Sequence, residues 1–379
     1  MNETKLALLY LLSQAANSQK AVKEQIENID IDALYNLCKE HLVAALVSSV
    51  LAEHLKDKPE QYAKWQQEQF SALYRDMNFA DERAKIISFL EQKGIWYMPL
   101  KGVVLKQYYP KPELREFADN DILFDPDFEA EVEEFMLSRG FIRKQTDSGH
   151  VMEYEKKPCL NFEMHRALYH TNNPVFYEYY KDVKSRLIKD EDNDFGYHFS
   201  DEDFYIFMVS HMYRHFRDNG TGIRSLLDIY VYNKAKGDTL DFNYIEKELE
   251  KIEALEYEKQ VRALSDKLFS GETLNLSEEE ERLTEYYFAS GVYGTKEIST
   301  VNAMKKMTGD TDFSKKGRRK YWIKRLFNME YYKQNYPRAY KTGIAIPFLI
   351  VFRFFRGLTK TDKIKAENEK LKRIEDNKK

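Results

Sequence analysis

The sequence predicts an α+β protein in which a mixed β-sheet core is flanked by helical N-terminal and C-terminal regions. Apolar residues recur at helical spacing near both ends of the chain, whereas short apolar runs separated by turns fill the stretch between them. These runs begin as strand, helix, strand and continue as a strand meander, which favours a mixed sheet. The expected parts are residues 1–93, 94–190, 191–300 and 301–379.

The composition is typical of a folded intracellular protein. The chain has 379 residues, of which 43% are hydrophobic and 32% charged, and its formal net charge is -4. Aromatic residues make up 14%, too many for a disordered chain, and the length allows about two or three domains. Cys38 and Cys159 cannot form a disulfide framework, so we expect a reduced, cytoplasmic protein. No apolar run reaches the roughly 18 residues that a membrane-spanning helix needs.

Helices are predicted throughout the first 93 residues. One apolar pattern at helical spacing, with Asp30 or Asp32 as its N-cap, comprises Leu34, Leu37, Leu42, Ala45, Leu46 and Val50. A second pattern within Gln61–Gln92 comprises Phe70, Leu73, Met77, Ala80, Ala84 and Ile87. Gly94 ends this second pattern, as a glycine just past a helix end does.

Strands and helices alternate in the next hundred residues. A buried strand is expected at Ile95–Leu100, a helix at Lys101–Tyr109, a strand at Asp119–Phe124 and an acidic helix at Asp127–Ser138. Further strands are expected at Phe141–Gln145, His150–Glu155 and Leu160–His165.

The remainder of the chain returns to helical patterns. Ser200 and the acidic residues after it cap a long helix, and Ile223–Lys236 forms another. Lys315–Lys324 is basic; we expect a solvated helix there, with contact to nucleic acid or anionic lipid as the alternative. Ile344–Phe355 is apolar; we expect it to dock onto the body of the protein, with peripheral membrane contact as the alternative. Lys360–Lys379 is almost wholly charged, which predicts a solvated or frayed helix.

Candidate metal ligands gather in the predicted strands. Asp119 and Asp121 are two residues apart, so on a strand their carboxylates point to the same face. Such a pair repels unless a cation lies between the two, and Mg²⁺ or Mn²⁺ bound to a substrate phosphate suits this arrangement. Glu163 is the candidate third ligand and would help to activate an attacking hydroxyl; Glu153 and Glu155 are weaker candidates. Alternatively, Asp119 binds no metal and only caps a turn.

Candidate phosphate-binding residues lie close to this acidic pair. Lys101 and Gly102 stand where a predicted strand turns into a helix, so the ammonium group and free backbone N–H groups would hold phosphate. Arg115 either clamps phosphate or pairs with the aspartates, and His165 either contacts substrate or fixes Glu163. Lys101 is otherwise an ordinary surface lysine.

Five motifs resemble the uncharacterised nucleotidyltransferase family over roughly residues 1–260. In chain order they are Leu100-Lys101-Gly102, Tyr109-Pro110 with Arg115, Asp119-Asn120-Asp121-Ile122-Leu123, Gly140-Phe141, and Glu163-Met164-His165-Arg166. A helix with His211 and His215 and a Leu226-Leu227-Asp228-Ile229 helix follow, as in that family. The resemblance implies a fold like that of DNA polymerase β.

The resemblance also implies a reaction. A nucleoside monophosphate would pass from a nucleoside triphosphate to an acceptor hydroxyl on a protein, an RNA, a sugar or a small molecule. The wider superfamily has Gly-Ser where this chain has Lys101-Gly102, an apolar residue is more usual at Asn120, and many relatives have aspartate at Glu163. These departures keep an alternative open, namely a relic fold that binds a nucleotide or a partner without turnover.

Overall fold

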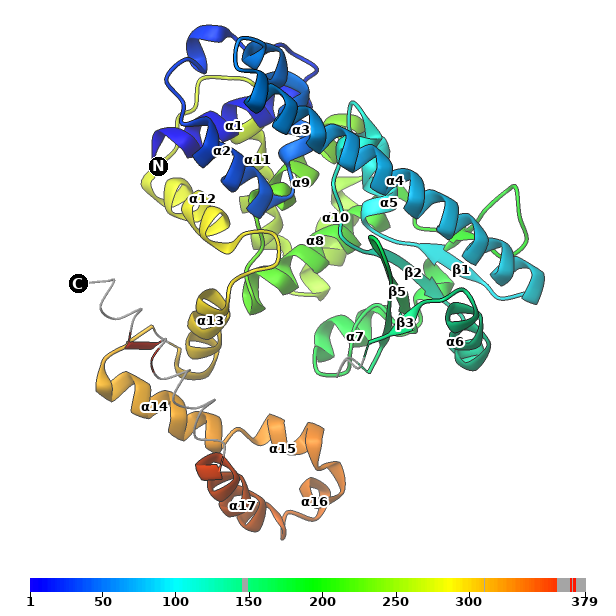
Figure 1. The fold of residues 1–379 in the computed structure, drawn as a ribbon. Helices are drawn as coiled ribbons and strands as arrows, with labels where there is room; N and C mark the ends of the chain where they lie inside the picture. Colours follow the sequence, from blue (N-terminus) through cyan, green and yellow to red (C-terminus); the bar gives the residue numbers. More distant parts are fainter. Residues whose placement is uncertain (145–148, 310, 360–368, 370, 373–379) are drawn as a thin grey trace. The chain divides into compact units, whose positions relative to one another are not determined.

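The structure, a computed structural model, describes residues 1–144, 149–309, 311–359, 369 and 371–372 (Figure 1). The chain forms two compact units. The first comprises Met1–Tyr213 and Gly222–Phe288, and the second comprises Arg214–Thr221 and Ala289–Lys379. The candidate site lies in the first unit.

Helices make up the first part of the chain, as predicted. They are α1 (Glu3–Ala16), α2 (Ile31–His41), α3 (Ala44–Leu51) and α4 (Pro59–Lys93). Asp30, rather than Asp32, caps α2, because its carboxylate accepts hydrogen bonds from two backbone N–H groups of the first turn. Gly94 ends α4 in the left-handed conformation, at a φ of 71°.

The buried face of α4 is not the one that its apolar spacing marks. Phe70, Leu73 and Met77 are exposed, Phe70 by 63%. The residues that α4 buries are Trp65, Glu68, Ala72, Phe79, Glu82, Ile86 and Leu90. Because this 35-residue helix carries apolar residues on opposite faces, spacing alone does not select the face that packs on the core.

A mixed five-stranded sheet follows α4, which confirms the predicted fold class. Its strands are β1 (Tyr97–Pro99), β2 (Asn120–Phe124), β3 (Ile142–Arg143), β4 (Val151–Lys156) and β5 (Leu160–His165). Their order is β1-β2-β5-β4-β3, with β2 and β5 parallel and the other neighbours antiparallel. Of the strand expected at Phe141–Gln145, Gln145 lies outside the described residues.

Short helices connect these strands. They are α5 (Gly102–Leu105) and α6 (Glu129–Ser138), with 3₁₀ turns at Lys106–Tyr108, Pro112–Leu114 and Pro126–Phe128. The predicted helix at Lys101–Tyr109 is thus one α-helical turn followed by one 3₁₀ turn.

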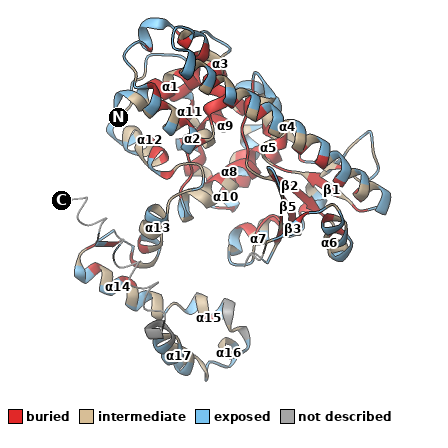
Figure 2. Ribbon diagram, in the orientation of Figure 1, coloured by how far each residue is buried: buried red, intermediate tan, exposed pale blue. Residues whose placement is uncertain are grey.

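The two faces of the sheet differ in chemistry. One face is apolar and packs against α4 and α6; its strand residues are Ile122, Phe124, Met152, Tyr154, Phe162 and Met164. Figure 2 shows the sheet strands among the buried parts of the chain. Since neighbouring residues on a strand alternate between faces, the acidic residues at odd-numbered positions are on the opposite face.

Helices complete the first unit. First come α7 (Pro174–Tyr180) and a two-stranded ribbon of β6 (Ile188–Lys189) and β7 (Tyr197–His198). The helices that follow are α8 (Asp201–Asp218), α9 (Ile223–Lys236), α10 (Phe242–Lys251), α11 (Leu255–Phe269) and α12 (Glu278–Ser290). The last residues of α8 and of α12 belong to the second unit.

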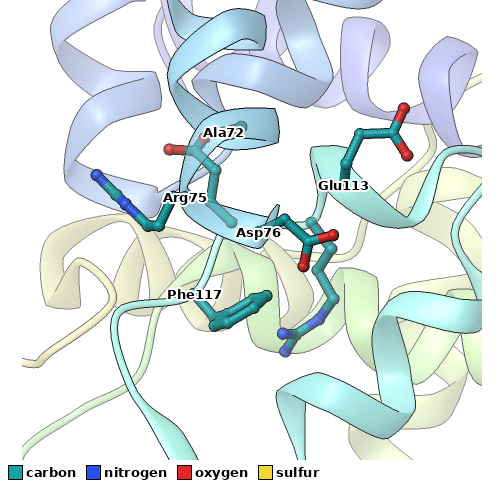
Figure 3. A pocket seen from close by; sticks show the side chains of 7 residues that line it. Ala72, Arg75, Asp76, Glu113 and Phe117 are labelled. Atoms are coloured by element: carbon teal, nitrogen blue, oxygen red, sulfur yellow. The ribbon is translucent and has the colours of Figure 1, made fainter. Parts of the chain in front are cut away.

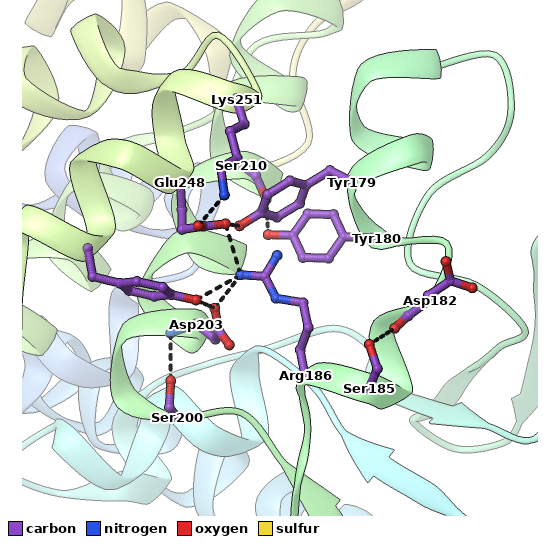
Figure 4. Close-up of polar contacts among 11 residues, drawn as sticks. Tyr179, Tyr180, Asp182, Ser185, Arg186, Ser200, Asp203, Ser210, Glu248 and Lys251 are labelled. Atoms are coloured by element: carbon purple, nitrogen blue, oxygen red, sulfur yellow. Dashed lines mark hydrogen bonds and ion pairs between the residues drawn. The ribbon is translucent and has the colours of Figure 1, made fainter.

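Arg186 fastens the segment between α7 and α8 to two of these helices (Figure 4). Its guanidinium donates to Asp203 at 2.6 Å and to Glu248 at 3.3 Å, and Tyr179 donates its hydroxyl proton to Glu248. Burial and the hydrogen bond to Glu248 raise the pKa of Tyr179, so the phenol stays protonated. The network therefore holds α7 and the turn after it against α8 and α10.

The second unit consists of helices around a small core. They are α13 (Lys296–Thr308), α14 (Lys315–Leu326), α15 (Met329–Asn335), α16 (Pro337–Thr342) and α17 (Ile346–Thr359). Met304, Phe313, Tyr321 and Leu371 form the core. No helix among the described residues is long and apolar enough to cross a membrane. The helix predicted at Lys360–Lys379 lies almost entirely outside the described residues.

Candidate metal centre

Strand register brings the predicted acidic residues together. Asp121 on β2 lies directly opposite Glu163 on the parallel strand β5. His165 is two residues beyond Glu163, so its imidazole projects from the same face. One ligand atom from each of Asp121, Glu163 and His165 lies within 4.8 Å of the others. The described residues therefore present one cluster with the chemistry of a metal site.

Asp121 is the central member of the cluster. Its side chain is 3% exposed, and its Oδ1 lies 2.8 Å from His165 Nε2 and 3.2 Å from Lys101 Nζ. Burial alone would raise the pKa of Asp121, but the Lys101 charge and the hydrogen bond from His165 outweigh it and hold the pKa below its usual value. Asp121 is therefore ionised, and the side chains of Lys101 and His165 supply the positive charge beside it.

His165 contacts both carboxylates of the cluster, those of Asp121 and Glu163. Its Nε2 also lies 3.5 Å from Glu163 Oε2. Burial would lower the pKa of His165, but hydrogen bonds to Asp121 and Glu163 raise it above the usual value. An imidazolium donates protons and cannot ligate a metal, so His165 serves better to orient Asp121 than to bind a cation.

Asp119 differs from Asp121 in its electrostatics. It lies just before β2, is partly buried, and is not one of the three residues whose ligand atoms come within 4.8 Å. Burial, together with the negative charge of Asp121, raises the pKa of Asp119 to about 6. A bound cation would relieve this repulsion.

The two weaker candidates, Glu153 and Glu155, differ in their surroundings. Glu153 on β4 lies opposite Glu163, and burial followed by the Glu163 charge raises its pKa. It extends the acidic row across three adjacent strands. Glu155 is exposed and forms an ion pair with Lys144.

Lys101 reaches Asp121 from a strained turn. Its φ of 48° and ψ of -109° lie in a region that L-residues rarely adopt. The preceding residue is tied to β2, because the Leu100 N–H donates to the Asp121 carbonyl at 3.0 Å. Gly102 then starts α5. The strained backbone at Lys101 therefore belongs to the turn that places its ammonium group beside Asp121.

Arg115 pairs with Asp228 and not with the aspartates of the acidic pair, which was one of its two expected roles. Its Nε and Nη2 each donate to Asp228 on α9 at 2.8 Å, and the Tyr109 hydroxyl donates to the same carboxylate. The third nitrogen, Nη1, is buried and has no hydrogen-bond partner in the described structure. It lies 2.8 Å from where a Cβ on Gly102 would be, so it remains available beside the Lys101 turn.

This pairing corrects one expectation and adds one residue. Arg224 and Asp228 are one helical turn apart, which predicts a salt bridge, but Arg224 instead donates to the Glu116 carbonyl at 2.6 Å. Sequence reasoning matched Asp228 to a family motif and gave it Arg224 as its partner. It missed Arg115, which is 113 residues away in the sequence.

A small pocket borders Arg115 (Figure 3). It is lined by Ala72, Arg75, Asp76, Glu113, Arg115, Glu116 and Phe117. Its cavity volume is about 10 Å³, close to that of one water molecule and far below the roughly 300–1,000 Å³ of ligand pockets. None of the three clustered residues lines this pocket, so it is not part of the metal centre.

The donor set fits a hard divalent cation. Asp121 and Glu163 offer carboxylate oxygens within the cluster, and Asp119, just before β2, offers a third carboxylate. Carboxylate oxygens are the ligands of Mg²⁺ and Mn²⁺. The identity of the cation and the roles of these residues remain predictions.

The comparisons with known proteins agree with this geometry. No curated protein and no solved structure matches the chain. The family model described as "Uncharacterised nucleotidyltransferase" matches residues 27–270, which is more than half of the chain and includes every residue of the metal centre. The match confirms the resemblance that the motifs indicate, and the chain belongs to this nucleotidyltransferase family.

Proposed function

We propose that the chain is a Mg²⁺- or Mn²⁺-dependent nucleotidyltransferase that transfers a nucleoside monophosphate from a nucleoside triphosphate to an acceptor hydroxyl. The supporting observation is the register of Asp121 with Glu163 beside the Lys101 turn, in a chain of this family. The acceptor is a protein, an RNA, a sugar or a small molecule.

The reaction exchanges one bond to phosphorus for another. The acceptor oxygen bonds to the α-phosphorus, the bond from that phosphorus to the bridging oxygen breaks, and pyrophosphate leaves with the electron pair. Glu163 receives the acceptor proton, since it is the less buried carboxylate of the clustered pair. A bound cation supplies positive charge that offsets the negative charge developing on the phosphates.

The other residues have positioning roles in this proposal. Asp119 and Asp121 hold the cation, and His165 orients Asp121 through their 2.8 Å contact. Lys101, Gly102 and the unpartnered Nη1 of Arg115 seat the phosphates. Lys101 neutralises Asp121 in the structure described here. With a cation held by Asp121, the Lys101 ammonium group would be free to bind the triphosphate.

Thermal unfolding with each nucleoside triphosphate tests the binding half of this proposal. A ligand bound only by the folded chain stabilises it by about 2.7 kcal/mol at a hundred times its Kd. We expect the melting temperature to rise with nucleotide plus Mg²⁺ but not with nucleotide plus EDTA. Asp119→Ala and Asp121→Asn should abolish the rise, whereas the exposed Asp32→Asn control should keep it. An equal rise without metal would refute the role of the two aspartates.

A further inference from the structure

The second unit concentrates positive charge. Residues 313–359 contain twelve lysines and arginines but one acidic residue, Glu330, while the whole chain has a formal net charge of -4. Seven of the twelve residues of α14 are cationic and none is acidic. Lys315, Lys316 and Arg319 of that helix are exposed. The unit therefore carries a cationic surface on an otherwise acidic protein, a charge asymmetry that indicates an anionic partner.

The same unit exposes a continuous apolar helix face. Phe348, Val351, Phe352 and Phe355 of α17 follow the spacing of one helix face, and Phe348 is 75% exposed. Further exposed apolar side chains in the unit are Ile323, Phe327, Met329, Ile344 and Phe354. An apolar surface of this extent is uncommon on a protein that remains surrounded by water.

Arg353 lies on the opposite side of α17 from this apolar face. The Arg353 guanidinium lies 3.6 Å from the centroid of the Tyr331 ring and 5.6 Å from that of Tyr332. The cation–π contacts hold this charge away from the face that Phe348 and Phe352 form. Since α14 also packs against α17, the cationic and apolar surfaces belong to one structural unit.

We propose that the second unit binds the surface of an anionic phospholipid bilayer, with α17 lying in the interface. The phenylalanines enter the boundary between headgroups and acyl chains, and the cations of α14 attract the lipid phosphates. At 14 residues, α17 is suited to lie on a bilayer rather than to span it. This inference is independent of the proposed nucleotidyl transfer.

The alternative occupants fit less well. Single-stranded RNA would neutralise the cations, but it would leave the aliphatic residues Ile323, Ile344 and Val351 in water. A second copy of the chain would cover the apolar face while bringing two cationic surfaces together. Residues 360–379 are mostly charged and supply few apolar side chains.

Flotation of the full-length chain with vesicles tests the proposal without nucleotide or metal. We expect the chain to float with vesicles of phosphatidylcholine plus phosphatidylglycerol and to remain unbound with phosphatidylcholine alone. Replacing Lys315, Lys316 and Arg319 with Gln should weaken binding about fivefold for each charge removed. Phe348→Ser and Phe352→Ser should each weaken it about tenfold, because each removes an inserted ring.

Matched variants on α4 control for lost apolar surface. Phe70 and Met77 are 63% and 61% exposed, so Phe70→Ser and Met77→Ser remove similar surface from the first unit and should leave flotation unchanged. Circular dichroism establishes that each variant is folded, and the wild-type comparison of the two vesicles decides the question even if a variant is not.

Three results overturn the proposal. The first is failure of the wild-type chain to float with anionic vesicles, whether or not it binds single-stranded RNA in a filter assay. The second is flotation that survives the phenylalanine substitutions in folded variants, which excludes insertion of α17. The third is dimerisation in size-exclusion chromatography that is lost in those variants, without any vesicle binding.

Discussion

At the residue scale, the two aspartates of the acidic pair have opposite effects on the folded state. Asp121 has a lowered pKa because Lys101 and His165 stabilise its charge, whereas burial and Asp121 itself raise the pKa of Asp119 to about 6. The repulsion that the sequence predicts between the two carboxylates implies that replacing one aspartate by asparagine relieves it. The structure assigns that relief to Asp119 alone.

Asparagine substitutions should therefore change stability in opposite directions in metal-free protein at pH 7. Asp119→Asn should raise the free energy of unfolding by on the order of 1 kcal/mol, allowing for the part of this side chain that contacts solvent. Asp121→Asn leaves Lys101 and His165 without their shared carboxylate and should lower it by about 3 kcal/mol. Urea unfolding with EDTA measures both. Each variant removes one negative charge, so changes of the same sign would contradict this assignment.

The Asp119 effect should also depend on pH. The unfolded carboxyl releases its proton near 3.8 and the folded one near 6, so the folded chain binds more protons between these values. Wild-type stability accordingly falls relative to Asp119→Asn as the pH rises through this window. Measured from pH 4 to pH 7, the free energy of unfolding that Asp119→Asn gains over wild type should grow and then level off. A gain that shrinks toward pH 7 would contradict the raised pKa of Asp119.

At the scale of elements, Arg115 connects the segment after α5 to α9. Its two hydrogen bonds to Asp228 are buried, so loss of either partner leaves an uncompensated charge. A double-mutant cycle with Arg115→Gln and Asp228→Asn should give a coupling of about 2–3 kcal/mol. The matched cycle with Arg224→Gln should give about 1 kcal/mol or less. Equal couplings would contradict this difference and would support the Arg224–Asp228 salt bridge that their helical spacing predicts.

The start of α2 offers a second test at this scale. Asp30 accepts hydrogen bonds from the backbone N–H groups of Asp32 and Ala33, whereas Asp32 makes an exposed ion pair with Lys64. Asp30→Ala should cost about 1 kcal/mol of unfolding free energy. Asp32→Ala should cost less than about 0.5 kcal/mol. Thermal unfolding ranks the two variants, and the reverse order would move the cap to Asp32.

At the scale of the whole molecule, local patterns predicted the sheet better than they predicted its surroundings. Alternation along a strand predicted Asp119, Asp121, Glu163 and His165 on one face. The parallel register of β2 and β5 sets Asp121 opposite Glu163, with His165 two residues further on, whereas Asp119 lies before β2. Partners distant in sequence escaped prediction, as Arg115 and Asp228 show, because the fold and not the spacing brings them together. The buried face of α4 escaped for a related reason, since both of its faces carry apolar residues.

Transfer of labelled phosphorus tests the central claim most directly. Wild-type chain is incubated with Mg²⁺ or Mn²⁺, a cell extract as the source of acceptor, and each nucleoside triphosphate labelled at either the α- or the γ-phosphorus. Nucleotidyl transfer predicts stable label in an acceptor from the α-labelled nucleotide alone. Asp121→Asn should abolish the labelling and Asp32→Asn should retain it. Absence of transfer from every α-labelled nucleotide would instead identify a non-catalytic binding module, and transfer from a γ-labelled one would identify a different reaction.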